Sequence, residues 1–230
     1  MKNNKHKIIL FKTFLIYFLF TFALPSVAQN KKLIQVIIDN SGILHDEKDP
    51  QGKTSFDAFV MDFLNTLAVK HRRERDSTTI RITSAVENPR VVWMGSASNF
   101  SREGVKSNDI KNLFVNKTGC NDISTALEDA SITMSIKSAK INILYLITSG
   151  VHSGKDCTDM TQDDYVKLLE ALDKNFAEKV KEYSSKFDKF SIQFLTSAQR
   201  RLFYNALTDN TFQKNLESQG QDPLIFESDD

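Results

Sequence analysis

Three short polar segments of this 230-residue chain carry the residue types that could do chemistry. They are 39–43 (Asp-Asn-Ser-Gly-Ile), 119–122 (Gly-Cys-Asn-Asp) and 148–152 (Thr-Ser-Gly-Val-His). Each offers hydroxyl, amide or carboxylate oxygens directly after an apolar run or directly before a helical pattern. Such oxygens are the ligands that hard cations such as Mg²⁺ and Ca²⁺ take from proteins. We refer to the three segments together as the loop rim, and the chemistry that they indicate is the binding of a hard cation.

Two strongly apolar runs lead into the first and third segments of the loop rim. Residues 33–38 and 141–147 are rich in β-branched and aliphatic side chains, which is typical of strands buried on both faces. In a parallel sheet, ligands are met by loops that leave the carboxyl ends of strands where the strand order reverses. We therefore expect the loop rim to lie along one edge of such a sheet.

The rest of the chain alternates helical and strand patterns. Apolar residues at positions 56, 59, 60, 63, 64 and 67 repeat with helical period, which predicts an amphipathic helix entered at Thr54 or Ser55. The β-prone runs 78–85 and 91–94 are joined too closely for a helix, so we expect an antiparallel hairpin. Further elements are expected as helices at 107–114 and 122–136, one long helix from Thr161 to Tyr183, a strand at 191–195 and a helix from Ser197. This order predicts an α/β fold of three layers, α/β/α, with a mostly parallel central sheet and one antiparallel edge strand.

The first 28 residues have the pattern of a secretory signal peptide. Four lysines and no acidic residue precede the apolar stretch Phe14 to Leu24, and small residues follow at positions 26 and 28. We predict cleavage after Ala28 and a secreted or periplasmic protein, with an uncleaved N-terminal membrane anchor as the alternative. Removal of this segment changes the net charge from +1 to −3. We expect a domain over residues 29–218, an acidic tail over 219–230 and, without a basic block, no binding of nucleic acid.

The loop rim resembles the metal-ion-dependent adhesion site of the von Willebrand factor type A (vWA) domain family. That site opens with Asp-x-Ser-x-Ser after the first strand; here Asp39 and Ser41 match, and Ile43 stands at the second Ser. The family's second loop provides a Thr, where this chain has Asn121. Its third loop often reads Leu-Thr-Asp-Gly, and Ser149 stands at the Asp position. The resemblance covers roughly residues 31–216, and the expected antiparallel edge hairpin also fits the family.

The resemblance implies a protein-interaction module and not an enzyme. In an intact site of the family, one Asp, two Ser and one Thr hold a divalent cation, and an acidic group of a partner protein completes its shell. Carried over to this chain, the implied ligands of Mg²⁺ or another divalent cation are Asp39, Ser41, Asn121 and Ser149. The missing hydroxyl and the missing third-loop carboxylate lower the expected cation affinity. The residues implied at the surface that meets an unidentified protein of the envelope or extracellular space are Asp122, Thr148 and His152. A metal-free binding module or structural component of the cell envelope is the alternative.

The two cysteines gain a meaning from the predicted export. An oxidising compartment makes Cys120 and Cys157 candidates for a disulfide, with two buried thiols as the alternative. Two cysteines cannot form an all-cysteine zinc site. The resemblance places Cys120 in the second loop and Cys157 just beyond the third, so it implies that both lie on the loop rim.

Three enzymatic interpretations lack an essential residue. The segment 52–54 (Gly-Lys-Thr) opens a helix as a phosphate-binding loop would, but Glu47 stands where that motif needs glycine. Asp39 could be the nucleophile of a haloacid-dehalogenase-like phosphatase, but Ser41 replaces the second Asp of that family. A hydrolase using Ser41 and His152 lacks the Gly-x-Ser-x-Gly elbow. Because none of these motifs is complete, we expect no enzymatic activity.

Overall fold

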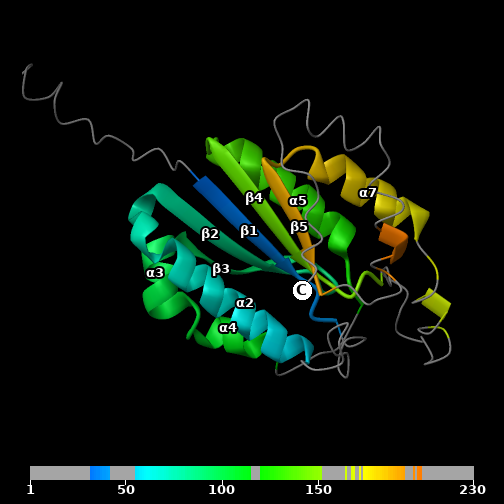
Figure 1. Cartoon of the computed structure of the whole chain (residues 1–230), viewed down its shortest axis with the longest axis horizontal. Helices are drawn as coiled ribbons and strands as arrows, with labels where there is room; N and C mark the ends of the chain where they lie inside the picture. Colours follow the sequence, from blue (N-terminus) through cyan, green and yellow to red (C-terminus); the bar gives the residue numbers. More distant parts are fainter. Residues whose placement is uncertain are drawn as a thin grey trace, which may run out of the picture.

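The computed structural model describes residues 32–41, 55–114, 120–151 and 173–194, together with residues 164, 167, 168, 171, 199 and 201–203. These residues form a five-stranded sheet with helices on both faces (Figure 1). The strand order is β3-β2-β1-β4-β5. The strands are β1 (Lys32–Ile38), β2 (Thr78–Ser84), β3 (Arg90–Ser96), β4 (Ile141–Ile147) and β5 (Lys189–Gln193). Only β3 is antiparallel to its neighbour, so the predicted α/β class with one antiparallel edge strand is confirmed.

The central strand β1 is covered along both edges and on both faces. β2 and β4 pair with it over its whole length. Ile34, Val36 and Ile38 belong to one apolar core, and Ile37 belongs to the other. The apolar run in the sequence, in which Gln35 is the one polar residue from 33 to 38, therefore reflects burial on two faces, as in other parallel sheets.

The first core lies between the sheet and α2 (Phe56–His71). Val60, Leu64 and Leu67 of this helix recur at helical spacing and are buried. The Ser55 side chain accepts a hydrogen bond from the backbone N–H of Ala58, so Ser55 is the N-cap. The predicted amphipathic helix is thus confirmed.

The second core lies on the opposite face of the sheet, beneath α5 (Ile123–Lys137) and α7 (Lys174–Ser184) (Figure 1). The buried residues of α5 are Ile123, Ala126, Leu127 and Ala130, as their spacing in the sequence indicated. Helices on both faces complete the predicted three layers.

The segment after β3 forms α3 (Ala97–Asn99), the π-helical turn η3 (Phe100–Gly104) and α4 (Asn108–Asn112). The sequence pattern indicated only the last of these helices. Trp93 of β3 packs on the fully buried Phe100, with ring centroids 4.7 Å apart. A β-carbon at position 104 would lie 2.5 Å from Cδ2 of Phe100, so only glycine fits beneath these rings. A contact between aromatic rings, and not helical periodicity, shapes this segment.

The prediction of one long helix from Thr161 to Tyr183 is wrong, because α7 begins only at Lys174. Asp173 has an extended backbone (φ −68°, ψ 106°), and its side chain accepts a hydrogen bond of 3.0 Å from the N–H of Phe176. This N-cap satisfies a backbone donor that a continuous helix would pair internally. The apolar stripe runs through the break, which is why periodicity alone did not show it.

A distant side chain stabilises the other side of the same break. Nε2 of Gln199 donates hydrogen bonds to the carbonyl oxygens of Leu168 and Ala171, over 2.9 and 3.0 Å. These carbonyls lie where a helix leaves its last acceptors without intrahelical partners. The break therefore depends on a residue that lies 31 positions from Leu168 in the chain.

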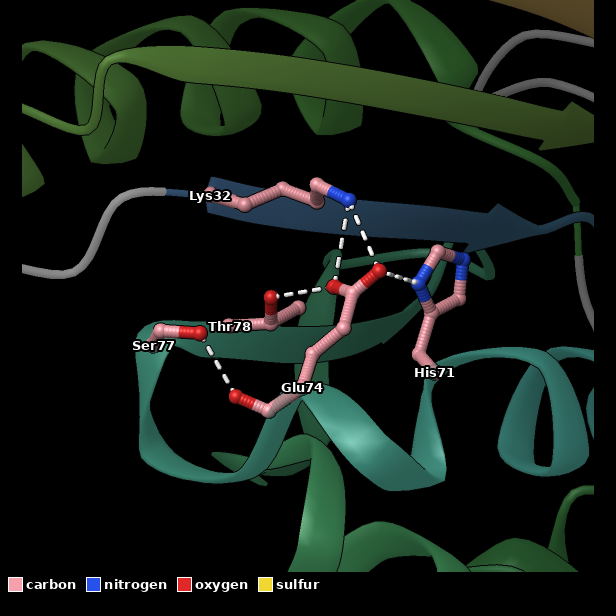
Figure 2. A network of polar contacts seen from close by, with 5 residues as sticks. All are labelled: Lys32, His71, Glu74, Ser77 and Thr78. Atoms are coloured by element: carbon pink, nitrogen blue, oxygen red, sulfur yellow. Dashed lines mark hydrogen bonds and ion pairs between the residues drawn. The ribbon is translucent and has the colours of Figure 1, made fainter.

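A polar cluster joins the amino ends of β1 and β2 to the turn η2 (Arg72–Ser77) that follows α2 (Figure 2). Nζ of Lys32 lies 2.9 and 3.1 Å from the two carboxylate oxygens of Glu74. Oγ1 of Thr78 donates to the same carboxylate, and Nδ1 of His71 lies 2.9 Å from its Oε1. Partial burial would raise the pKa of Glu74, but these contacts outweigh it and lower the pKa to about 2. The cluster thus fixes the start of the central strand.

Several predicted features lie outside the described residues. They include the signal peptide 1–28, the acidic tail 219–230 and the segment 42–54. Within the described part of the chain, no helix combines the length and apolarity needed to cross a membrane.

Candidate functional site

The described residues of the loop rim, 39–41, 120–122 and 148–151, meet where the strand order reverses. β1 and β4 are neighbours in the sheet although β2 and β3 come between them in the chain. Beyond the strand ends, the N–H of Asp39 donates to the carbonyl of Ile147 over 2.9 Å. The structure therefore brings these segments together at the carboxyl ends of the strands, which is where parallel sheets place their sites.

Asp39 is the centre of the site and is fully buried. Its Oδ2 accepts hydrogen bonds from Nδ2 of Asn121 and Oγ1 of Thr148, both over 2.9 Å. Its Oδ1 accepts a longer one, of 3.3 Å, from the backbone N–H of Ser41. Each segment of the loop rim thus contributes a donor to this one carboxylate.

The donors around Asp39 are neutral, and this determines its acidity. Burial raises the pKa of Asp39 above its ordinary value of 3.8, because a desolvated carboxylate disfavours its charged form. Hydrogen bonds from Ser41, Asn121 and Thr148 lower the pKa in part, without reversing the direction. The site therefore contains a carboxyl group that holds its proton more tightly than an exposed one does.

Asn121 links all three segments of the loop rim. Besides its bond to Asp39, its Nδ2 donates to the carbonyl of Val151 over 2.7 Å. Its backbone forms an isolated antiparallel bridge with Val86, beyond the end of β2. Only 1% of the residue is exposed. The resemblance implied a ligand oxygen at this position, whereas the structure directs N–H groups from it at Asp39 and Val151.

The hydroxyl groups of the loop rim have different hydrogen-bond partners. Thr148, expected at the partner surface, is buried, and its Oγ1 contacts Asp39 while accepting from the N–H of Gly150. The φ of 90° at residue 150 lies in the left-handed region that favours glycine. Oγ of Ser149 accepts from the N–H of Val151 over 3.3 Å. Oγ of Ser41 lies near the Asp39 carboxylate but makes no hydrogen bond of ordinary geometry with any described residue.

Asp122, also expected at the partner surface, is mostly buried and caps α5. Its side chain accepts a hydrogen bond from the N–H of Thr125 over 3.1 Å. The other residues implied for the loop rim, His152, Cys157 and Ile43, lie outside the described residues. Cys120 is buried, and the described part of the chain contains no free cysteine.

Sequence reasoning missed two polar residues that support the site from behind. Oγ of Ser84 donates to Oδ1 of Asn40 over 2.7 Å, and Nδ2 of Asn40 donates to the carbonyl of Leu113 over 3.0 Å. Both side chains stand at the ends of buried strands, where a polar group needs a partner. A polar residue at the end of a strand pattern was the sequence signal by which both residues could have been identified.

The described donor set does not fit a divalent cation as it is arranged. Both oxygens of Asp39 face N–H or O–H donors, and Asn121 presents hydrogen atoms where a ligand oxygen is required. Asp122 uses its carboxylate as a helix cap. Among the described residues, no three His, Cys, Asp or Glu side chains gather closely enough to hold a metal ion. Mg²⁺ and Ca²⁺ bind through several oxygen lone pairs, and here both oxygens of Asp39 are already engaged by donors.

Asp39 is also unsuited to the role of a phosphatase nucleophile. Its side chain is fully buried, and three donors engage its oxygens. Attack on a substrate would require a free and accessible carboxylate oxygen.

Comparison with known proteins gives matches in structure and none in sequence. The sequence matches no family model, and no curated protein matches it. A variant of the PilB minor pilin from Streptococcus sanguinis matches with a TM-score of 0.52 and 12% identity, over 87% of this chain and 57% of that one. This chain thus spans little more than half of the pilin structure. The SpRpn10 VWA domain matches with a TM-score of 0.49 and 10% identity, over 77% of this chain and 82% of that one.

A third match is the manganese-loaded TRAP protein of Plasmodium vivax, with a TM-score of 0.44 and 15% identity, over 78% of this chain and 64% of that one. The structural neighbours include vWA domains, and the parallel sheet with an antiparallel β3 edge is the topology that the resemblance implied. The chain has a vWA-like fold. At these identities the similarity shows the fold alone, so the role of the vWA-like domain must be argued from its site.

Proposed function

We propose that this chain is an exported protein-interaction module with a vWA-like fold, which binds a partner protein at the loop rim and catalyses no reaction. The observation that carries the proposal is the convergence of all three segments on Asp39 at the reversal of strand order. The buried residues do not themselves meet the partner. They hold in place the surface above them, which lowers the entropy that binding must remove.

Export and a disulfide belong to the same proposal. The pattern of residues 1–28 supports export, with cleavage after Ala28. The absence of a free thiol at the described Cys120 supports a bond to Cys157, the other cysteine of the chain. Such a bond would connect the second segment of the loop rim to the chain just after the third.

The partner surface can be tested with substitutions next to the loop rim and a control at the far end of α5. α5 begins at the loop rim, where Thr125 is exposed, and ends at the opposite edge of the sheet, where Ser135 is exposed. We expect Thr125→Arg, combined with Glu87→Arg on the exposed turn after β2, to reduce capture of partners from a native envelope extract at least tenfold. A tenfold loss corresponds to about 1.4 kcal/mol of binding free energy.

Ser135→Arg is the matched control for Thr125→Arg tested alone, because it adds the same side chain to the same helix away from the loop rim. We expect this variant to capture the same proteins as the wild type. Circular dichroism and urea unfolding should show that all the proteins are equally folded. Equal capture by the variant next to the loop rim and by the control would contradict partner binding at the loop rim.

A further inference from the structure

We infer that the side-chain amide of Asn121 occupies the place of a divalent cation at Asp39, so that the loop rim is built and held without a metal ion. The inference concerns the site of the proposed function but does not rest on partner binding, because its readout is the free chain.

The first argument is the geometry around Oδ2 of Asp39. In the site that the resemblance implies, a cation would be held by oxygens from Asp39 and from the second and third segments of the loop rim. Nδ2 of Asn121 makes the same links with its two N–H groups, to Asp39 over 2.9 Å and to the carbonyl of Val151 over 2.7 Å. Thr148 provides the second donor to Oδ2. The carboxylate is thus joined to both segments through hydrogen atoms.

The second argument is that a cation and this amide exclude one another. A metal ion accepts lone pairs, whereas both contacts of Nδ2 present hydrogen atoms to acceptors. Reversing the amide would place Oδ1 of Asn121 against the oxygens of Asp39 and Val151. The observed orientation is the one in which both acceptors have a donor.

The third argument is charge. Asp39 is the carboxylate that the described residues place in the site, and Asp122 is engaged with the start of α5. Two neutral donors fully engage Oδ2 without adding charge to a buried volume. A divalent ion here would have Asp39 as its one described carboxylate within a buried site, because Ser149 stands where the third loop of the family has Asp.

Melting temperature tests the inference on the mature chain, residues 29–230. We expect the wild type in EDTA and in 5 mM Mg²⁺, Mn²⁺ or Ca²⁺ to melt within 1 °C of one another. Asn121→Ala removes both donors without adding a ligand, so it should melt at least about 5 °C lower and remain insensitive to these ions. Asn121→Asp has the same shape but places a second carboxylate beside Asp39. It should melt lower in EDTA and recover at least half of the loss in Mn²⁺.

Three results would overturn the inference. The first is a saturable rise in the wild-type melting temperature with a divalent ion that Asp39→Asn abolishes. The second is an Asn121→Ala protein as stable as the wild type. The third is an Asn121→Asp protein that no ion stabilises, because the place beside Asp39 would then not be interchangeable between amide and cation.

A measurement on the wild type covers the case in which the variants fail to fold. Mn²⁺ is paramagnetic and broadens the NMR signals of nearby nuclei. With ¹⁵N-asparagine labelling, we expect the side-chain amide signal of Asn121 to keep its intensity during a Mn²⁺ titration. Selective loss of this signal at substoichiometric Mn²⁺ would place the ion at Asp39 and refute the inference, whatever the outcome of partner capture.

Discussion

A single buried carboxyl group determines how the loop rim responds to pH. Asp39 is surrounded by neutral donors, and burial is the dominant influence on its pKa. A neighbouring basic side chain would have lowered that pKa instead. The raised pKa of Asp39 therefore indicates that neutral hydrogen-bond donors, and not a basic side chain, surround the carboxyl group.

The first prediction follows from this sign. The folded state holds the Asp39 proton to a higher pH than the unfolded chain, whose pKa is near the ordinary 3.8. As pH rises from this value through the folded pKa, the unfolded chain releases its proton first, and stability falls. We expect the stability of the wild type relative to Asp39→Asn to fall steadily as pH rises through this window. Urea unfolding in EDTA at successive pH values measures the difference.

Asp39→Asn is the reference for the wild type, because the two proteins share every other titrating group. A difference that stays constant with pH would contradict the raised pKa. A difference that grows with pH would reverse its direction and would point to a cationic partner.

At the scale of elements, the amino ends of the strands are held by a charged cluster, whereas the carboxyl ends are held by neutral donors. The carboxylate of Glu74 contacts the side chains of Lys32 in β1, Thr78 in β2 and His71 at the end of α2 (Figure 2). The turn between these elements contains Arg75 at φ 50°, a conformation that non-glycine residues adopt at a cost. The contacts of Glu74 hold this turn against the sheet.

The second prediction concerns this cluster. We expect Glu74→Gln to destabilise the folded chain by about 1 kcal/mol at pH 7, a modest value because solvent reaches about a third of the carboxylate side chain. The folded pKa of about 2 lies below the ordinary 4.5, so the contribution is complete above pH 4.5 and disappears as pH falls toward 2. Urea unfolding at pH 7 and pH 3 measures both effects.

Glu182→Gln is the matched control, because Glu182 also pairs with a lysine, Lys186, over 3.0 Å, but lies on the exposed face of α7. This control should change stability by less than about 0.5 kcal/mol. Equal losses in the two variants would show that the Glu74 cluster has no special role.

At the scale of the whole molecule, the two clusters lie at opposite ends of the central strand. β1 begins at Lys32, next to Glu74, and ends just before Asp39. Seven residues of strand separate these ends by about 23 Å. β1 therefore begins at the end of the sheet opposite the loop rim.

The third prediction is the disulfide between Cys120 and Cys157. It would close a loop of 37 residues, for which chain entropy gives a stabilisation of roughly 4 kcal/mol. We expect thiol titration of the denatured, unreduced mature chain to find no free sulfhydryl, and two after reduction. A Cys120→Ser, Cys157→Ser double variant should lose roughly 4 kcal/mol of unfolding free energy, and it should therefore unfold at a lower urea concentration. Two reactive thiols before reduction would refute the pairing.

The sequence by itself determined the sheet that positions the site and the starts of α2 and α5. Apolar runs marked β1 and β4 because burial on two faces leaves no polar alternation. Residues such as Ser55 and Asp122 marked helix starts, because a cap bonds to a backbone donor only a few positions away. These are local signals, and a local pattern is sufficient to reveal them.

Tertiary structure alone decided what the site does with these residues. Asn121 and Thr148 reach Asp39 across 82 and 109 positions of the chain, so no local pattern could show that they direct hydrogen atoms at the carboxylate. The same holds for Gln199. Its side chain stabilises a helix break, although the apolar stripe in the sequence continues across that break. Periodicity reports which face of an element is buried, whereas the donors and acceptors that meet there depend on which distant elements pack together.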